Sequence, residues 1–485
     1  MPVPVLILVI ILGAPTALIA FMAVRAALVK PHAPPEREVS DLGIDKNALA
    51  AHLAGAVQIP TVSMADETYP EKPFFDYKEY IEKTYPLFAK AAECTVVNKY
   101  SLVYRIDGSD ANLKPACFLA HIDVVPAPPE GWDYPPFGGE IHDGFVYGRG
   151  AQDMKCQMIA VLDALEFTLA NGGGLKRAAY CCFGHDEELS TLDGAPEIVK
   201  YLDSLNVRPE YVLDEGGVML DGGPLGVDGT LALIGVCEKG YMDVRLSRKK
   251  AGGHASTPAK PTALASVAKA VCNVERKQLP PVWTAPTIEL IRELAPYMKP
   301  LFKFVMVNRD VLSPFIKFAL SKLHPISAAL VKTTFAPTMA KGSDAANVLP
   351  PYAEAVVNCR LIAGNSPETV LAHIKKVAGR GIDVEVINRA VPASKISPAD
   401  TPSYVKIADA VRTAFPGVKV APYMFIAATD SRFYYPICDN VYRFSPFAYT
   451  EDDQRRIHAV NERCNIDDLK KATEFFVRII GDTCL

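Results

Sequence analysis

The stretch Ala178–Ala195, AAYCCFGHDEELSTLDGA, places three acidic residues directly after a short apolar run. An apolar run that ends at Phe183 and is followed by Gly184 is typical of a buried strand. Successive side chains of an extended segment point to opposite sides, so Glu187 and Glu188 are expected to face different partners. A metal ion with its bound water would satisfy both carboxylates. A solvated acidic loop after a core strand is the other interpretation, because charge runs usually face water.

Strand-like and helical patterns alternate on both sides of this stretch. Strand-like runs lie at Ser101–Ile106, Ala116–Ala120 and Tyr211–Leu213. Helical patterns lie at Asp45–Ala56, Asp76–Ala91, Cys156–Ala170 and Ala195–Leu205. This alternation predicts an α/β fold, with a mostly parallel sheet covered by helices on both faces.

The pattern changes near Gly240, which predicts an inserted α+β domain within the sheet domain. A helical apolar stretch runs from about Thr287 to Val331, and a strand-like run, Ala353–Ile362, closes the block. Alternation of helices and strands resumes from Pro367. We therefore expect an N-terminal segment at 1–30, a linker at 31–43, the sheet domain at 44–239 and 363–485, and the insert at 240–362.

The N-terminal segment is uncharged from Pro2 to Val24 and is rich in Leu, Ile, Val and Ala. Its length suffices for a helix to cross a bilayer, so we expect an apolar N-terminal helix that anchors the chain in a membrane through residues 3–24. A cleaved signal peptide, which would make the protein secreted, is the alternative, although the basic start of such a peptide is missing. Arg25 and Lys30 follow the segment and favour a cytoplasmic remainder.

Composition excludes some other classes of protein. The chain of 485 residues has a formal net charge of −4 and no basic block with interleaved aromatic residues, so we expect no nucleic-acid partner. Its eleven cysteines show no paired spacing, and an odd count does not describe a disulfide framework.

Several histidines and carboxylates are candidate metal ligands because they follow strands or turns. His121 and Asp123 are two residues apart, so they lie on one side of an extended segment, and Asp123 is placed to hold the second ring nitrogen of His121. Asp153 follows a glycine-rich turn, where a helix N-cap is the alternative. Asp214 ends a strand, and His458 lies near the end of the chain. Taken singly, each of these residues is equally compatible with a structural role.

Together, seven motifs in this order resemble those of the co-catalytic di-zinc metallopeptidases, the family of aminoacylase, glutamate carboxypeptidase and succinyl-diaminopimelate desuccinylase. The motifs are His121-Ile-Asp123, Gly148-Arg-Gly-Ala-Gln-Asp153-Met-Lys155, Asp186-Glu-Glu188, Asp214-Glu-Gly-Gly217, Gly252-Gly-His-Ala-Ser256, Asn347-Val-Leu-Pro350 and His458-Ala-Val-Asn-Glu462. The resemblance runs from about Ile44 to the C-terminus. It is greatest to the carboxypeptidase S and N-fatty-acyl-amino-acid synthase/hydrolase branch.

The resemblance implies two zinc ions per chain, with Co2+ or Mn2+ as substitutes. By this resemblance Asp153 bridges the two ions, followed by a cis peptide bond. The other metal ligands that it implies are His121 and Asp214 at one ion and Glu188 and His458 at the other. Glu187 would be the general base and Asp123 a supporting catalytic residue.

The resemblance also implies residues that bind the substrate. His254 in the insert would hold the oxyanion, and in dimeric relatives this histidine comes from the other subunit; an ordinary loop histidine is the alternative. Arg360 and Asn347 would bind the substrate carboxylate, and for Arg360 a surface arginine on a strand is the alternative. The insert would then be a lid and dimerisation domain, giving a possible homodimer.

The expected function is hydrolysis of the amide bond of N-acyl amino acids or short peptides with a free C-terminal carboxylate, through water activated by zinc and Glu187. A deacylase or desuccinylase for a small polar amide is one alternative. A membrane-anchored binding protein without catalysis is another. Family precedent places the catalytic part outside the cytoplasm or in a lumen, against the basic residues after the N-terminal segment, so the side of the membrane stays open.

Overall fold

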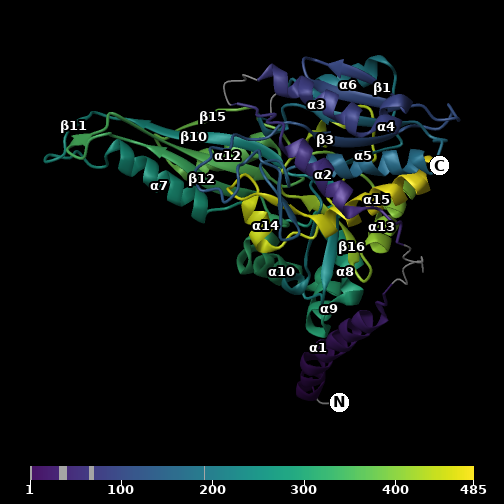
Figure 1. The fold of residues 1–485 in the computed structure, drawn as a ribbon. Coiled ribbons are helices and arrows are strands. Elements are labelled where there is room, and N and C mark those ends of the chain that lie inside the picture. The colour runs from purple at the N-terminus through teal and green to yellow at the C-terminus, as the bar shows by residue number, and fades with distance from the viewer. Residues whose placement is uncertain (1–2, 32–40, 65–69, 190–191) are drawn as a thin grey trace.

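The computed structural model describes residues 3–31, 41–64, 70–189 and 192–485 (Figure 1). Nine strands of this described part form one large sheet in the order β1–β2–β6–β3–β7–β17–β9–β16, with β8 beside β9. These strands are β1 (Ala92–Val97), β2 (Ser101–Ile106), β3 (Ala116–His121), β6 (Ala179–Gly184), β7 (Tyr211–Asp214), β8 (Val218–Asp221), β9 (Thr230–Glu238), β16 (Lys419–Phe425) and β17 (Val441–Arg443).

The predicted α/β fold is confirmed, but the expectation of a mostly parallel sheet is wrong. The pairs β3–β6, β3–β7, β7–β17 and β9–β16 are parallel, whereas β1–β2, β2–β6, β8–β9 and β9–β17 are antiparallel. A tight turn with Asn98 and Lys99 at positive φ joins β1 to β2. Such a short connection can join only antiparallel strands, because parallel neighbours need a long crossover.

Helices cover both faces of the large sheet. On one face, Leu53 of α2, Leu162 of α5 and Phe476 of α15 pack in one core with Phe118 of β3. On the other face, Ile198 of α6 packs in a second core with β3, β6 and η4. The helices around this sheet are α2 (Lys46–Val57), α3 (Glu71–Thr84), α4 (Pro86–Ala91), α5 (Lys155–Ala170), α6 (Ala195–Ser204), α13 (Pro402–Ala414), α14 (Glu451–Arg456), α15 (Ile466–Cys484) and the 3-10 turns η1 (Glu187–Leu189), η2 (Gly223–Leu225) and η4 (Asp430–Tyr434). A small sheet of β4 (Glu140–His142), β5 (Phe145–Tyr147) and β18 (Arg463–Asn465) lies beside α2 and α15.

A four-stranded sheet extends away from this body, ending in the hairpin-like pair β11–β13 (Figure 1). Val274 of α7, Ile374 of α12 and Val357 of β14 pack together on one face of this sheet. Its elements are β10 (Gly240–Lys249), β12 (Thr334–Lys341), β14 (Tyr352–Leu361), β15 (Asp383–Val386), α7 (Ala263–Arg276) and α12 (Pro367–Ala378), with β11 (Gly253–His254) and β13 (Val348–Leu349) at the far end.

The predicted insert boundaries at 240 and 362 do not follow this packing. β15 pairs with β10 although it lies beyond residue 362. Conversely, Leu290 of α8 packs in a core with Leu233 of β9 and Tyr423 of β16, both in the large sheet. The helices of this segment are α8 (Ala285–Leu294), η3 (Ala295–Tyr297), α9 (Pro300–Val307), α10 (Arg309–Leu323) and α11 (Pro325–Ala329). We therefore propose that the second unit comprises residues 240–277 and 333–391.

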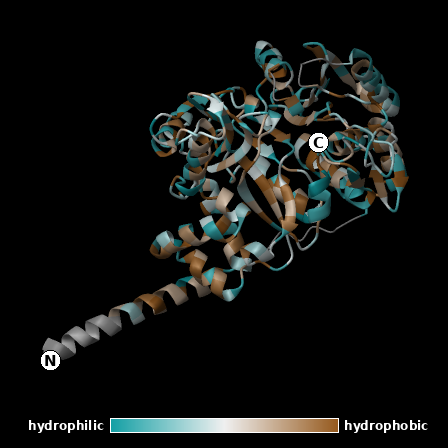
Figure 2. Cartoon of the chain, turned by 90° about the vertical axis from the view of Figure 1, so that its left-hand side faces the viewer, coloured by the Kyte–Doolittle hydropathy of each residue, from teal (hydrophilic) through white to brown (hydrophobic). Residues whose placement is uncertain are grey.

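The N-terminal segment forms helix α1 (Val3–Leu28) beside α9 (Figures 1 and 2). Met22 and Ala26 are buried, Asn308 donates a hydrogen bond to the Met22 carbonyl at 3.0 Å, and Arg25 lies 2.9 Å from Asp310. In the described part of the chain no helix combines the length and apolarity needed to cross a membrane. The expected membrane anchor at residues 3–24 is thus corrected, since the last turns of α1 instead pack and pair with the α9–α10 helices.

Phe476 tests how far the C-terminal helix contributes to the central core. Its side chain is 1% exposed, and its ring lies edge-on to that of Phe118 with the centroids 6.3 Å apart. We expect Phe476→Ala to lower the free energy of unfolding by about 3–5 kcal/mol, because it removes buried apolar surface and leaves a cavity. Urea denaturation followed by circular dichroism measures this loss. Val405→Ala on α13, where the side chain is 47% exposed, is the control and should change stability by less than about 0.5 kcal/mol.

Candidate metal centre

The predicted ligands lie at the carboxyl ends of neighbouring parallel strands. His121 is the last residue of β3 and is in register with Gly184, the last residue of β6. Glu187 and Glu188 follow β6 on η1. Parallel strands that end together bring the side chains after them to one edge of the sheet, which is where α/β folds place their sites.

Asp153 lies at the centre of the cluster. Its Oδ1 is 3.2 Å from Nε2 of His121, and its Oδ2 is 3.1 Å from Nε2 of His458. The same nitrogen of His458 lies 3.0 Å from Oε2 of Glu188. The Asp153–Met154 peptide bond is cis, as the resemblance predicted. Four residues far apart in the sequence therefore meet around one carboxylate whose two oxygens face different histidines.

Asp123 supports this arrangement through hydrogen bonds. Nδ1 of His121 donates a hydrogen bond to the Asp123 carbonyl at 2.9 Å, so Nε2 is the ring nitrogen that faces Asp153. The Asp123 carboxylate accepts the backbone N–H groups of Glu187 and Glu188, both at 3.2 Å, and the Ser63 hydroxyl at 2.9 Å. Asp123 therefore orients three of the candidate residues without being placed as a ligand itself.

We propose Glu215 in place of the predicted Asp214 as the candidate ligand beside His121. Oδ2 of Asp214 accepts the Ser431 N–H at 2.9 Å. Oε1 of Glu215 lies 3.5 Å from Nε2 of His121. Adjacent residues at a strand end point to opposite sides, so only one of this acidic pair can face the cluster.

Glu462 is a supporting residue to which the sequence analysis assigned no role. It is fully buried, accepts the backbone N–H of Gln152 at 2.8 Å and that of Asp153 at 3.1 Å, and pairs with Arg149. Burial raises the pKa of Glu462, an effect that Arg149 and the hydrogen bond from Gln152 oppose. The signal available in the sequence was its place in the last motif, four residues after His458.

A cleft of about 530 Å³ opens beside the cluster, and both acids and cations line it. Glu187, Glu188 and Asp430 are among the acids. Arg360, predicted as a substrate-binding residue, lines the cleft as well, and its guanidinium lies 4.7 Å from the centre of the Tyr241 ring. Two further cations that the sequence analysis did not single out, Arg389 and Arg432, also line the cleft.

His254 and Asn347 are not among the residues that line this cleft. His254 lies on β11 at the far end of the second sheet, where its Nδ1 is 2.7 Å from the Ser256 hydroxyl and its side chain is exposed (Figure 1). The Asn347 carbonyl accepts the Ala255 N–H at 2.9 Å, so the two predicted residues lie close together. Within one chain they do not join the other site residues.

Several carboxylates lie close together in the cluster, where burial and mutual repulsion raise the pKa of three of them. Burial raises the pKa of Glu187 and of Glu215 well above the ordinary value, and neighbouring carboxylates add to both shifts. Burial likewise raises the pKa of Glu188. Hydrogen bonds to Asp153 and Glu188 raise the pKa of His458 to about 10. Without a cation, these residues can keep their charges only by sharing protons.

The residues present fit a divalent metal. Ligand atoms of His121, Asp153 and Glu188 lie within 4.8 Å of one another, and so do those of His121, Glu187 and Glu215. Oε1 of Glu188 is buried and, in the described part of the chain, has no hydrogen-bond partner. Imidazole and carboxylate ligands suit zinc, and a cation would remove the repulsion that raises the pKa values.

Comparison with known proteins points to a family of peptidases. The profile of Peptidase family M20/M25/M40 matches residues 117–482. The N-fatty-acyl-amino acid synthase/hydrolase PM20D1 of Xenopus tropicalis is 36% identical over 444 residues, covering 90% of this chain and 86% of the relative. The probable carboxypeptidase S-like 2 of Dictyostelium discoideum is 33% identical over 448 residues, covering 90% and 85%.

Solved structures share the fold at low identity. The M20 family metallo-carboxypeptidase Sso-CP2 of Sulfolobus solfataricus superposes with a TM-score of 0.67 at 19% identity, covering 90% of this chain and 99% of its own. Human carnosine dipeptidase 1 superposes with a TM-score of 0.63 at 16% identity, covering 96% and 98%.

The proposal of Glu215 in place of Asp214 can be tested by metal binding. We expect Glu215→Gln to weaken zinc binding by at least about tenfold, since changes to residues that merely support a site already cost this much. Asp214→Asn is the matched control, because the amide oxygen can still accept the Ser431 N–H. Competition with a fluorescent zinc chelator measures both affinities. A larger loss in Asp214→Asn than in Glu215→Gln would restore the original assignment.

Metal removal should make stability depend on pH in a defined direction. Glu187 has a raised pKa in the metal-free folded state. Above pH 4.5, its ordinary pKa, the folded state therefore keeps a proton that the unfolded state loses. The metal-free form therefore loses stability as pH rises, and the raised pKa of His458 acts in the same direction above 6.5. We expect the gain in melting temperature on adding zinc to be roughly 2 °C or more larger at about pH 8 than at about pH 6.

Thermal unfolding with a chelator and with zinc, at each of the two pH values, gives this difference directly. Groups far from the cluster change stability with pH equally in the zinc-free and zinc-bound forms. Their contributions therefore cancel in the difference between the two melting temperatures. A zinc-dependent gain that shrinks as pH rises would contradict the prediction.

Proposed function

From the premise that the chain belongs to peptidase family M20/M25/M40, we propose that it hydrolyses the amide bond of N-acyl amino acids or short peptides that end in a free carboxylate. The observation that carries the proposal is the position of Glu187, between the histidine and carboxylate cluster and a cleft that contains Arg360. The names of the N-fatty-acyl-amino acid synthase/hydrolase and carboxypeptidase S-like relatives support the same substrate class.

The proposed metal content is two zinc ions per chain. The two carboxylate oxygens of Asp153 face different histidines, His121 at 3.2 Å and His458 at 3.1 Å, which supports a bridging role. Glu215 would complete the ligands on the His121 side, and Glu188 those on the His458 side. When bound, the metal would supply Lewis acidity and lower the pKa of a water molecule.

Glu187 is the proposed general base. Its side chain lines the cleft, and its carboxylate lies within 4.8 Å of the ligand atoms of His121 and Glu215, which supports proton transfer to and from a water molecule at that place. The Glu187 carboxylate would take a proton from the attacking water and return it to the nitrogen of the leaving amine. Its backbone N–H is fixed on Asp123, so the side chain keeps a constant position relative to His121.

Arg360 is the proposed anchor for the substrate carboxylate. A planar guanidinium matches the two oxygens of a carboxylate, and the Tyr241 ring beneath it limits its orientation. Arg389 and Arg432 line the same cleft and would raise its affinity for an anion. A substrate held in this way would direct its amide bond toward Glu187.

We further propose that a second copy of the chain completes the site. His254 and Asn347 lie together at the exposed end of the second sheet, outside the cleft of their own chain. A homodimer formed through this sheet would place the pair at the partner's cleft, where His254 would hold the developing oxyanion.

Glu187→Gln tests the mechanism. The variant keeps the shape of the side chain but cannot accept a proton, so we expect turnover to fall by at least about 100-fold. Zinc content should stay at the wild-type level. Initial rates with a long-chain N-acyl-phenylalanine and with the dipeptide Gly-Leu, together with metal analysis, measure both quantities.

Glu451→Gln is the control for this substitution, because that side chain is 89% exposed on α14 and should leave the rate unchanged. Retained turnover in Glu187→Gln would remove Glu187 as the base. A wild-type protein that binds zinc but cleaves neither substrate would refute the proposed substrate class.

A further inference from the structure

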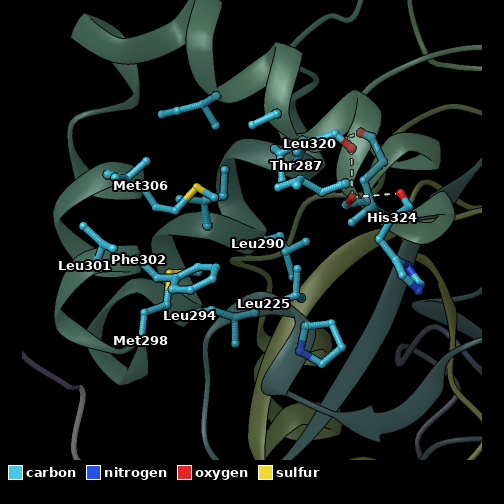
Figure 3. A pocket seen from close by; sticks show the side chains of 18 residues that line it. Leu225, Thr287, Leu290, Leu294, Met298, Leu301, Phe302, Met306, Leu320 and His324 are labelled. Atoms are coloured by element: carbon cyan, nitrogen blue, oxygen red, sulfur yellow. Dashed lines mark hydrogen bonds between the residues drawn. The ribbon is translucent and has the colours of Figure 1, made fainter.

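A second cavity, of about 290 Å³, lies between the helices α8, α9, α10 and α11 and shares no lining residue with the metal-centre cleft (Figure 3). Side chains from several helices point toward one another around it, and almost all of them are apolar. Its inner wall includes Leu290, Leu294 and Ile316, each 3% exposed or less. Apolar side chains that surround an open space gain free energy when an apolar group covers them, and most small-molecule sites are lined in this way.

The two hydroxyl groups in the wall already have hydrogen-bond partners. The Thr287 hydroxyl donates a hydrogen bond to the Leu330 carbonyl at 2.8 Å. The Ser327 hydroxyl lies 2.8 Å from the Leu320 carbonyl and 2.9 Å from the His324 carbonyl. A polar group pushed into this cavity would lose its hydrogen bonds to water without replacement, so the buried part of an occupant must be hydrocarbon.

The cavity opens to solvent at one side. Leu301 and Leu323 line it and are 72% and 78% exposed, and Phe302 is 40% exposed. An occupant can therefore enter without unfolding the helices and can leave a polar end in water. The volume is at the lower limit of the ~300–1,000 Å³ found for small-molecule sites, which suits one chain rather than a lipid with two.

His324, at the end of α10, contributes a hydrogen-bond donor to the edge of the lining. Its Nδ1 accepts the Ile326 N–H at 3.2 Å, so the proton of the neutral ring is on Nε2. The side chain lines the cavity and is exposed. Nε2–H is thus free to donate to an oxygen at the polar end of an occupant.

We propose that this cavity binds the acyl chain of a fatty carboxylate or of an N-acyl amino acid, at a site separate from the metal centre. The apolar wall takes the chain, and the polar end of the occupant stays in water at the exposed side of the cavity. The assignment stands on the lining of the cavity and does not depend on hydrolysis by the chain.

Photolabelling of the zinc-loaded full-length protein tests the proposal. The probes are dodecanoate and N-dodecanoyl-phenylalanine, each with a photoreactive diazirine in its chain, and labelled peptides are identified by mass spectrometry. We expect label in peptides of α8–α11 from at least one probe, and the mass of the adduct, with or without phenylalanine, identifies the bound species even where the metal centre hydrolyses the second probe. Label confined to peptides of the metal-centre cleft would overturn the proposal.

Three variants separate the cavity from the surrounding surface. Ala319→Phe fills the cavity from α10, and Leu323→Glu places a negative charge at its entrance. We expect each to lower labelling of α8–α11 by at least roughly tenfold. Phe315→Glu is the matched control, since Phe315 is 76% exposed on α10 but does not line the cavity, and it should label as the wild type does. Leu323 is exposed enough for its variant to fold even if Ala319→Phe does not.

Undiminished labelling in Leu323→Glu and in folded Ala319→Phe would overturn the proposal. Equal loss in Phe315→Glu would do so too, because it would mean adsorption to the surface. Hydrolysis of N-acetyl-phenylalanine is measured in parallel as a readout of the metal centre alone. Failure of that activity with retained labelling would count against the proposed function and not against the cavity.

Discussion

Repulsion among half-buried carboxylates is the constraint on which the site depends. Asp153, Glu187, Glu188 and Glu215 lie together at the edge of the large sheet, and two imidazoles, those of His121 and His458, lie near enough to pair with them. Desolvation and mutual repulsion raise the pKa of three of these acids. A chain that keeps so many acids together needs a cation to balance them, and a divalent metal is the cation that histidine and carboxylate ligands favour. The acidic cluster therefore makes sense as a metal site and not as a stabilising feature of the fold.

Two further acids, Asp123 and Glu462, hold the proposed ligands in place through hydrogen bonds. Asp123 accepts the backbone N–H groups that follow β6, and Glu462 accepts those that precede α5. In each case a charged side chain binds the backbone of a distant segment, so the ligand positions do not depend on loop conformation alone. Arg149 balances the charge of Glu462, which is fully buried. The geometry around Asp153 is thus set by hydrogen bonds that link four separate parts of the chain.

The local sequence pattern predicts where helices and strands lie better than it predicts which other elements they pack against. The strand at Ser101–Ile106 was predicted to the residue, because its apolar run is bounded by polar residues. The α8–α11 helices were placed in the insert from their position in the sequence, yet they pack on β9 and β16 through contacts that no local pattern contains. The choice between Asp214 and Glu215 depends on which side of β7 faces His121, a question of strand orientation that composition cannot answer. Apolarity of the N-terminal segment similarly could not reveal that Arg25 pairs with Asp310.

The charge distribution of the cleft follows from its construction between two sheets. Glu187 and Glu188 are held by the large sheet, whereas Tyr241 and Arg360 belong to neighbouring strands of the second sheet, in register across β10 and β14. Guanidinium groups come from both parts of the lining, Arg360 from β14 and Arg432 from η4, and would attract the anionic end of a substrate into the cleft. Because the two walls belong to different sheets, the distance between catalytic and anchoring groups depends on how the sheets pack. A change in that packing would alter the length of substrate that fits, without any change in the metal ligands.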